Sequence, residues 1–344
     1  MTAPPGGTRI SLLRVRDLSV EFATRDGVVR AVTEVSFDLS PGQVLALLGE
    51  SGSGKSVTLR SILGLNPPVR TRVSGEILLK GEDINRLAER ARQDLRGGVV
   101  SMVFQEPMTT LDPVYTIGGQ IEETLIEHRG LERAAVHRRA RELLDLVQMP
   151  SPERCLASYP HEISGGMRQR AMIAIALACE PELLLADEPT TALDVTVQAQ
   201  ILWLLRDLQR RFGLAVIFVT HDLGVAAEIA DDAAVMYGGR IVEQAPIREL
   251  FRAPAHPYTE GLMHATVRRG QKGKALVPIP GAPPNLAALP PGCAFAPRCP
   301  HVKPVCIEAL PPLHVVASGH VSRCHLVPER LASPLLVLNK GGSL

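Results

Sequence analysis

The chain contains 344 residues, of which 45% are hydrophobic and 21% are charged. Its 37 lysine and arginine residues nearly balance 36 aspartate and glutamate residues, so the formal net charge is +1. This balance argues against a protein that coats nucleic acid or an anionic membrane by bulk charge, and no nucleic-acid partner is expected. No run of about 20 apolar residues occurs, and the first residues lack the apolar segment of a signal peptide. An integral membrane protein, a secreted disulfide scaffold and a disordered chain are therefore excluded.

The predicted elements alternate between strands and helices. Residues 12–42 alternate apolar and polar side chains around a turn at Arg25-Asp26-Gly27, which predicts an antiparallel hairpin. Short aliphatic runs at 44–48, 99–104, 183–186 and 214–220 predict strands that are buried on both faces of a parallel sheet. Residues 106–158 are mostly helical in pattern and lie between two of these strands. We expect an α/β fold with a mixed-sheet core, an antiparallel β subdomain and a helical insert at about 106–165.

Proline and cysteine are concentrated near the C-terminus. Residues 271–344 hold 13 of the 28 prolines and four of the six cysteines. The basic, glycine-bearing stretch at 267–276 is typical of a linker. We therefore predict a main domain at 1–265 and a Cys/Pro-rich module at 266–344.

A phosphate-binding motif follows the first aliphatic run. The motif G-x-x-x-x-G-K-[ST] is present as Gly49, Glu50, Ser51, Gly52, Ser53, Gly54, Lys55 and Ser56. Its place between a predicted strand and a predicted helix is the context that this motif requires. Backbone N–H groups and the helix N-terminus would bind phosphate oxygens, Lys55 would reach the β- and γ-phosphates, and Ser56 would ligate Mg²⁺. The motif alone predicts the binding of a nucleoside triphosphate such as ATP.

Two adjacent carboxylates end a later aliphatic run. Asp187 and Glu188 follow the run at 183–186. An apolar strand rarely ends in two charges without partners for them. Asp187 is predicted to hold Mg²⁺, and Glu188 to polarise the attacking water.

Further motifs closely resemble those of the ATP-binding cassette (ABC) proteins, whose nucleotide-binding domain is a P-loop NTPase. Residues 163–170, Ile-Ser-Gly-Gly-Met-Arg-Gln-Arg, resemble the family signature, and residues 191–194 resemble its D-loop. The resemblance implies catalytic roles for Glu188, His221 and Gln105, with Gln105 also at Mg²⁺. It implies that the nucleotide is contacted by Phe22, Thr58, Ser164, Gly165, Gly166 and Asp194, with Phe22 stacking on adenine.

The C-terminal third resembles that of peptide and nickel importers in the same family. The resemblance rests on the HPYT element at 256–259 and on the proline- and cysteine-rich stretch at 279–300. It implies an ATPase subunit that pairs head to tail with a second one, expected to be a different chain. Two permease subunits and an extracytoplasmic solute-binding protein would complete the importer. The chain would then lie peripherally at the cytoplasmic face of the cell membrane.

Four cysteines of the predicted tail module suggest a metal site. Cys293, Cys299, Cys306 and Cys324 are separated by 5, 6 and 17 residues. A disulfide is unexpected in a reducing cytoplasm, and four thiolates suit either an iron–sulfur cluster or zinc. The spacing lacks the C-x2-C pairs usual in structural zinc sites. Some members of the importer branch carry a [4Fe–4S] cluster at similarly placed cysteines, so such a cluster is expected, with zinc and reduced thiols as alternatives.

Two other functions fit a cassette ATPase. The first is action on nucleic acid or the ribosome, which usually requires two cassettes in one chain, zinc insertions or a basic surface. The second is a regulatory cassette without transport, which intact Lys55, Asp187, Glu188 and His221 disfavour. The sequence does not identify the peptide or related solute that would be transported.

Overall fold

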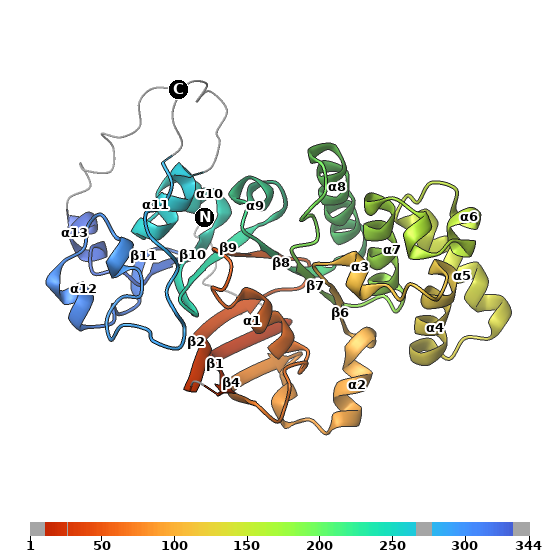
Figure 1. Cartoon of the computed structure of the whole chain (residues 1–344), viewed down its shortest axis with the longest axis horizontal. Coiled ribbons are helices and arrows are strands. Elements are labelled where there is room, and N and C mark those ends of the chain that lie inside the picture. The colour runs from red at the N-terminus through yellow and green to blue at the C-terminus, as the bar shows by residue number, and fades with distance from the viewer. Residues whose placement is uncertain (1–10, 26, 266–276, 333–344) are drawn as a thin grey trace, which may run out of the picture.

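The computed structural model describes residues 11–25, 27–265 and 277–332. Two sheets lie between a helical subdomain at one end of the long axis and the C-terminal segment at the other (Figure 1). The strands are β1 (Leu13–Thr24), β2 (Gly27–Leu39), β3 (Val44–Leu48), β4 (Thr71–Leu79), β5 (Glu82–Asp83), β6 (Val100–Val103), β7 (Leu183–Asp187), β8 (Ala215–Thr220), β9 (Asp232–Tyr237), β10 (Arg240–Pro246), β11 (His314–Ala317) and β12 (His320–Ser322). The α-helices are α1 (Lys55–Ile62), α2 (Glu89–Gly98), α3 (Pro107–Thr110), α4 (Ile117–Arg129), α5 (Arg133–Leu146), α6 (Pro152–Ala157), α7 (Gly165–Leu177), α8 (Val195–Phe212), α9 (Leu223–Ile229), α10 (Ile247–Arg252), α11 (Pro257–His264), α12 (Pro304–Glu308) and α13 (Val327–Ala332). None of these described helices combines the length and the apolar character that a membrane span needs.

The larger sheet has the strand order β11-β12-β10-β9-β3-β8-β7-β6. Strands β9, β3, β8, β7 and β6 run parallel, and β10, β12 and β11 continue the sheet antiparallel. The four aliphatic runs predicted as strands are confirmed as β3, β6, β7 and β8, within one residue at every end.

Two cores cover the two faces of this sheet. Along β3, Val44, Ala46 and Leu48 belong to a core shared with helices α4 to α11. Leu45 and Leu47 belong to a second core, shared with α1 and the smaller sheet. Burying one such aliphatic side chain stabilises the fold by about 1.5–3 kcal/mol. Because both faces are covered, β3 is aliphatic at every position.

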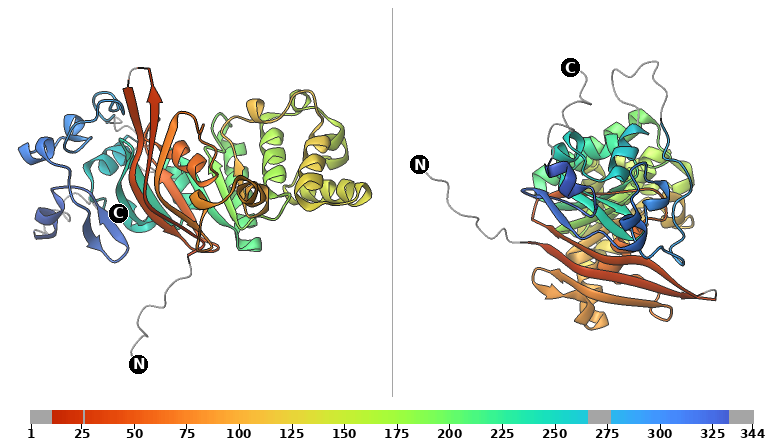
Figure 2. Two further views of the ribbon diagram at one scale, coloured as in Figure 1. Left: turned by 90° about the horizontal axis from the view of Figure 1, so that it is seen from below. Right: turned by 90° about the vertical axis from the view of Figure 1, so that its left-hand side faces the viewer.

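The smaller sheet has the order β2-β1-β4-β5 and packs against the central sheet (Figure 2). Strands β1 and β2 pair antiparallel from Leu13 opposite Leu39 to Thr24 opposite Gly27. This pairing confirms the predicted hairpin. Asp26, part of the predicted turn, lies outside the described residues.

The helical subdomain contains α3, α4, α5 and α6. Its interior includes Ile121 and Leu125 of α4 and Leu143 of α5, all fully buried. The mostly helical pattern predicted for 106–158 is therefore confirmed, while the bounds 106–165 of an inserted unit stay a prediction. Helix α7 starts where the Ser164 side chain accepts a hydrogen bond from the Met167 N–H, as an N-cap serine does.

The C-terminal segment extends the main sheet. Strand β12 pairs with β10, with Glu243 opposite Ser322 and Gln244 opposite Val321. The predicted linker at 267–276 and the predicted boundary at 265/266 fall at or beside residues 266–276, which lie outside the described ranges. The division into two domains stays a prediction.

A buried polar cluster fastens this segment to β10. The Glu243 carboxylate accepts hydrogen bonds from the backbone N–H groups of Ala255 (2.6 Å) and His256 (2.9 Å), and Nε2 of His320 lies 2.8 Å from its Oε1. His256 is the N-cap of α11, and its Nδ1 accepts from the Tyr258 N–H. Burial lowers the pKa of His256 to about 4, the Glu243 charge opposes this shift, and the Arg330 charge adds to it.

This pKa predicts a stability loss in mild acid. The pKa of His256 in the folded protein lies below its ordinary value of about 6.5. The contribution of neutral His256 to the free energy of unfolding is therefore complete above about pH 6.5, and it decreases as the pH falls towards 4. Between about pH 7.5 and about pH 5, His256 should lower the free energy of unfolding by about 2 kcal/mol. His256→Asn keeps an N-cap acceptor and removes the titration. Urea unfolding of both proteins at each pH should show a smaller decrease in the variant, and equal decreases would contradict this prediction.

Candidate nucleotide site

The phosphate loop joins β3 to α1. Gly49 has φ of 147°, and a Cβ there would lie 2.3 Å from the backbone oxygen of Met236. Gly54 precedes α1 with φ of 105°. Only glycine accommodates the first contact, and both angles are ones that other residues rarely adopt. The first N–H groups of α1 have no acceptor within their own helix, and such groups suit phosphate oxygens.

Lys55 is buried beneath this loop. Its Nζ donates to the backbone oxygens of Gly49 (2.7 Å) and Glu50 (2.9 Å). Burial lowers the pKa of Lys55, and the charges of Glu188, Asp187 and Glu50 oppose that shift. The ammonium is held by neutral carbonyl groups, so the charged oxygens of a triphosphate would be stronger partners for it.

Ser56 and Asp187 meet from two different elements. The Ser56 hydroxyl, in the first turn of α1, donates to Oδ1 of Asp187 at the end of β7 across 2.9 Å. Burial raises the pKa of Asp187, and the hydrogen bond from Ser56 opposes that shift. A hydroxyl and a carboxylate are oxygen ligands of the kind that Mg²⁺ prefers. Both groups line one pocket with Gln105.

Glu188 is the centre of a second network. Its Oε2 accepts from Gln105 Nε2 (3.3 Å) and Thr191 Oγ1 (2.9 Å), and Nδ1 of His221 lies 3.3 Å away. The three residues predicted for catalysis therefore lie together. Thr191 was not predicted as a site residue, although its position three residues after Glu188 is a local signal. Glu188 has φ of 47°, a left-handed conformation that is uncommon for glutamate.

The parallel sheet brings these groups to one edge. Leu48 lies opposite Thr220, and Asp187 lies opposite Val219. Because parallel strands end at the same edge, the loop after β3, the carboxylates of β7 and the histidine after β8 become neighbours.

Other predicted nucleotide contacts lie at the starts of α7 and α8. Ser164, Gly165 and Gly166 form the start of α7, where a Cβ on Gly166 would lie 2.8 Å from Val197 Cγ1. Asp194 is the N-cap of α8 and accepts from the N–H groups of Thr196 and Val197.

Phe22 and Thr58 are placed by packing. Phe22 lies on β1, partly buried against the second core. Thr58 is fully buried, and its hydroxyl donates to the Gly54 backbone oxygen (3.0 Å). Ser51 and Gly52 are exposed, whereas Ser53 is buried.

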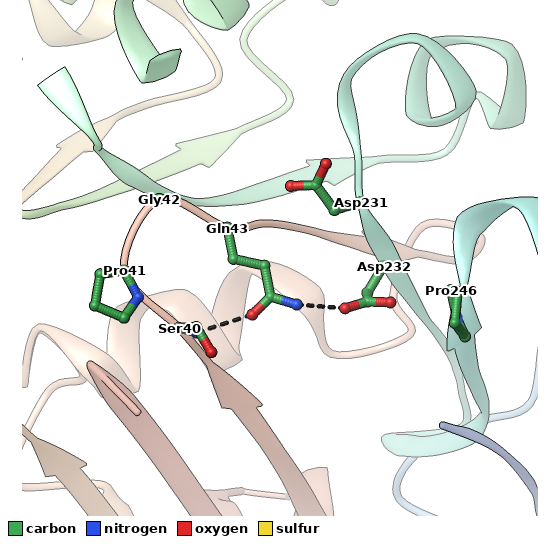
Figure 3. A pocket seen from close by; sticks show the side chains of 7 residues that line it. All are labelled: Ser40, Pro41, Gly42, Gln43, Asp231, Asp232 and Pro246. Carbon is green, nitrogen blue, oxygen red and sulfur yellow. Dashed lines mark hydrogen bonds between the residues drawn. The ribbon is translucent and has the colours of Figure 1, made fainter. Parts of the chain in front are cut away.

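A separate hollow lies at the opposite edge of the sheet, before β3 and β9 (Figure 3). There Gln43 accepts from the Ser40 N–H (2.8 Å) and donates to Asp232, and Asp231 accepts from the Val44 N–H (2.9 Å). These polar groups bind one another and stabilise the start of β3.

The four tail cysteines line one small cavity. All four are free thiols, and burial raises the pKa of Cys293 and Cys324 to about 11. The Cys299 sulfur accepts from the His301 N–H, and the Cys324 sulfur accepts from the Leu326 N–H. In the described ranges, no group of three or more His, Cys, Asp or Glu side chains is arranged to hold a metal ion.

A phosphate loop after β3, an acidic pair at the end of β7 and a helical subdomain between β6 and β7 define a P-loop ATPase. Family comparisons refine this class. A family model described as "ABC transporter" matches residues 32–191, and one described as "Oligopeptide/dipeptide transporter, C-terminal region" matches residues 242–306.

Curated proteins of similar sequence match over most of their length. The dipeptide transport ATP-binding protein DppD of Bacillus subtilis is 47% identical over 326 residues, which cover 94% of this chain and 97% of that protein. The oligopeptide transport ATP-binding protein OppD of Salmonella typhimurium is 48% identical over 320 residues, 93% of this chain and 95% of that protein. The chain therefore belongs to the ATP-binding proteins of ABC transporters that carry the oligopeptide/dipeptide transporter C-terminal region.

Solved structures share the fold of the cassette. The dimeric structure of MJ0796, described as a bacterial ABC transporter cassette, aligns with a TM-score of 0.62 at 28% identity and covers 69% of this chain and 99% of that chain. The same cassette in a dimeric post-hydrolysis state bound to ADP and Pi gives the same values. These comparisons confirm the ABC ATPase fold.

The burial of Lys55 predicts that removing its charge weakens ATP binding, whereas removing the charge of an exposed lysine does not. Lys55→Met keeps the length of the buried stem and removes the charge, so ATP affinity should fall at least about 100-fold, because a desolvated charge contributes strongly to phosphate binding. Calorimetric titration with Mg·ATP measures the effect. Lys80→Met is the matched control, since Lys80 is exposed and pairs with Glu182. Equal affinity in the Lys55 variant and wild type would contradict the assignment.

Proposed function

We propose that the chain binds and hydrolyses Mg·ATP and thereby energises the import of peptides through a membrane ABC importer. The observation that carries this function is the contact of Glu188 with Gln105 and His221, beside the Ser56–Asp187 pair. The names of DppD and OppD, which describe dipeptide and oligopeptide transport, support peptides as the substrate class.

The mechanism assigns a role to each element of the site. Gly49–Ser56 would bind the phosphates, with Lys55 at the β- and γ-phosphates. Ser56, Asp187 and Gln105 would hold Mg²⁺, which when bound neutralises phosphate charge. Glu188 would orient the attacking water, and His221 would stabilise charge that develops on the transferred phosphoryl group. The strained Glu188 backbone suits a side chain that must be held in one position.

A second cassette would complete the nucleotide site. Ser164, Gly165 and Gly166 open α7, where an N-cap serine and two glycines leave N–H groups for a γ-phosphate. In keeping with the family resemblance of these residues and Asp194, we place them opposite the phosphate loop of a partner cassette. The dimeric MJ0796 structures support pairing of this kind. We propose a different ATPase chain as the partner.

Permease subunits would bind beside Gln105. Gln105, which precedes α3, and Thr109 of α3 line one pocket with Asp187. Exposed apolar side chains gather in the same segment, with Met108, Val114 and Tyr115 each at least half exposed. This segment could carry a change at the nucleotide to two permease subunits at the cytoplasmic face of the membrane. An extracytoplasmic solute-binding protein would deliver the peptide.

Glu188→Gln should separate binding from hydrolysis. The amide cannot accept a proton from water, so ATP turnover should fall at least about 100-fold. Binding should persist, and the chain should accumulate as an ATP-bound dimer, alone or with its partner ATPase. Phosphate release and size-exclusion chromatography with ATP measure the two effects. Turnover at the wild-type rate would contradict the role of Glu188.

We propose a [4Fe–4S] cluster at Cys293, Cys299, Cys306 and Cys324. The support is the convergence of all four thiols on one cavity and the N–H groups directed at two of the sulfurs. Buried thiols with pKa values near 11 are protonated at neutral pH, so a bound metal centre must displace their protons. Zinc and metal-free thiols are the alternatives.

Anaerobic purification distinguishes these three states. A cluster should give a brown protein with broad absorbance near about 400 nm and equal iron and sulfide contents. Cys293→Ser should abolish the colour, while Cys179→Ser should retain it, because Cys179 is buried in the main core and away from the cavity. A colourless protein with stoichiometric zinc would establish zinc, and a metal-free protein would establish reduced thiols.

A further inference from the structure

An arginine of the cysteine-rich segment reaches the phosphate loop. Arg298 directly precedes Cys299, and only 5% of its side chain is exposed. Its Nη1 lies 2.6 Å from Oε2 of Glu50, and its Nη2 lies 3.0 Å from Oε1. Nε donates to the Pro280 backbone oxygen (2.8 Å), and Nη1 also donates to the Tyr237 hydroxyl (3.2 Å). With the Ile279 backbone oxygen, which accepts from Nη2 (3.4 Å), the guanidinium is fixed by five acceptors, two of them on Glu50.

Glu50, the second residue of the phosphate loop, is held at each of its polar groups. Its carboxylate accepts from Arg298, and its backbone N–H donates to the Tyr258 hydroxyl (2.8 Å). Its backbone oxygen accepts from Lys55 Nζ. Two of these three partners come from residues beyond 250, outside the part of the chain that carries the phosphate motif. The position of the loop therefore depends on helix α11, which holds Tyr258, and on the cysteine-rich segment.

Aromatic packing holds these partners in place. Phe295 lies between Cys293 and Cys299 in the sequence. The centroid of its ring lies 5.2 Å from that of Tyr237, which it meets edge-on, and 5.4 Å from that of Tyr258. The ring centroids of Tyr237 and Tyr258 lie 4.5 Å apart. All three rings are buried. A shift of the cysteine-lined segment would consequently move both groups that bind Glu50.

The charge of Glu50 gives this contact a consequence for nucleotide binding. A carboxylate in a loop that binds a triphosphate repels the ligand unless a cation compensates it. Arg298 supplies that cation in bidentate geometry, which is the strong form of this pair. The hydrogen bonds to Glu50 raise the pKa of Arg298, so the guanidinium is always charged.

We propose that Arg298 is a positioning residue for the ATPase, which neutralises and orients Glu50 so that the affinity of the phosphate loop for nucleotide depends on the cysteine-rich C-terminal segment. The inference rests on the proposed nucleotide site at Gly49–Ser56. It assigns the C-terminal region a role in ATP binding, besides any role at the cysteines themselves.

The test compares nucleotide affinity in four full-length variants. Arg298→Met leaves Glu50 uncompensated and should weaken Mg·ATP binding roughly tenfold. Arg298→Lys keeps the charge without the bidentate geometry and should recover part of the loss. Glu50→Gln combined with Arg298→Met removes both charges and should restore affinity to within about threefold of wild type. Glu50→Gln alone leaves the buried Arg298 charge without its carboxylate partner, so this variant should bind Mg·ATP no more tightly than the double variant does.

Arg330→Met is the matched control. Arg330 belongs to the same segment, and its Nη1 lies 2.6 Å from Glu260, with 26% of its side chain exposed. The Arg330 guanidinium also donates to the backbone oxygens of Pro254 and Ala255. The affinity of the Arg330→Met protein for Mg·ATP should stay within about twofold of wild type. Calorimetry gives the dissociation constants, and steady-state kinetics should show a raised KM for Arg298→Met with kcat nearly unchanged.

Three outcomes would overturn the proposal. They are wild-type affinity in folded Arg298→Met, an equal loss in Arg330→Met, and no recovery in the double variant. If Arg298→Met does not fold, the double variant decides, because a purely structural pair predicts weak binding in that variant. Lys55→Met separates this inference from the site itself: if that variant binds Mg·ATP as wild type does, the loop assignment fails, whereas failure of the Arg298 series alone overturns only the role of Arg298.

Discussion

The parallel register of β3, β7 and β8 is the constraint on which the candidate site depends. Leu48 lies opposite Thr220, and Asp187 lies opposite Val219, so three strands end level with one another. Each strand then delivers one kind of group: a loop of backbone N–H groups, a pair of carboxylates and a histidine. The two aliphatic cores on either face fix the strands, and the register gives contacts of about 3 Å between groups that are far apart in the sequence.

Rigidity at this edge comes from two sources. Local geometry supplies one, because the left-handed backbone of Glu188 must be maintained by its surroundings and only glycine fits against Met236 at Gly49. The other is supplied from a distance, since Glu50 is bound by Tyr258 and Arg298. A loop that must receive a highly charged ligand is thus shaped partly by its own sequence and partly by a segment about 250 residues further along the chain.

The features that sequence predicted best are those with a local cause. The strand–loop–helix pattern around Lys55 requires glycines at fixed offsets, and the aliphatic run before Asp187 requires burial on both faces, so both are visible within ten residues. The contact of Arg298 with Glu50 could not be predicted, because nothing near either residue specifies its partner. The pairing of β12 with β10 could not be predicted either. Strand β12 has only three residues, and its register depends on the buried Glu243 rather than on a pattern in its own sequence.

That pairing also constrains when the protein can finish folding. Strand β10 is complete at Pro246, but its neighbour β12 begins only at His320. During synthesis, β10 therefore presents an open strand edge until residues 320–322 have been made, and open edges favour pairing with other chains. Contacts across such long sequence separations also form slowly. Strand β12, made more than 70 residues after β10, would thus cover this edge and protect the nascent sheet from aggregation.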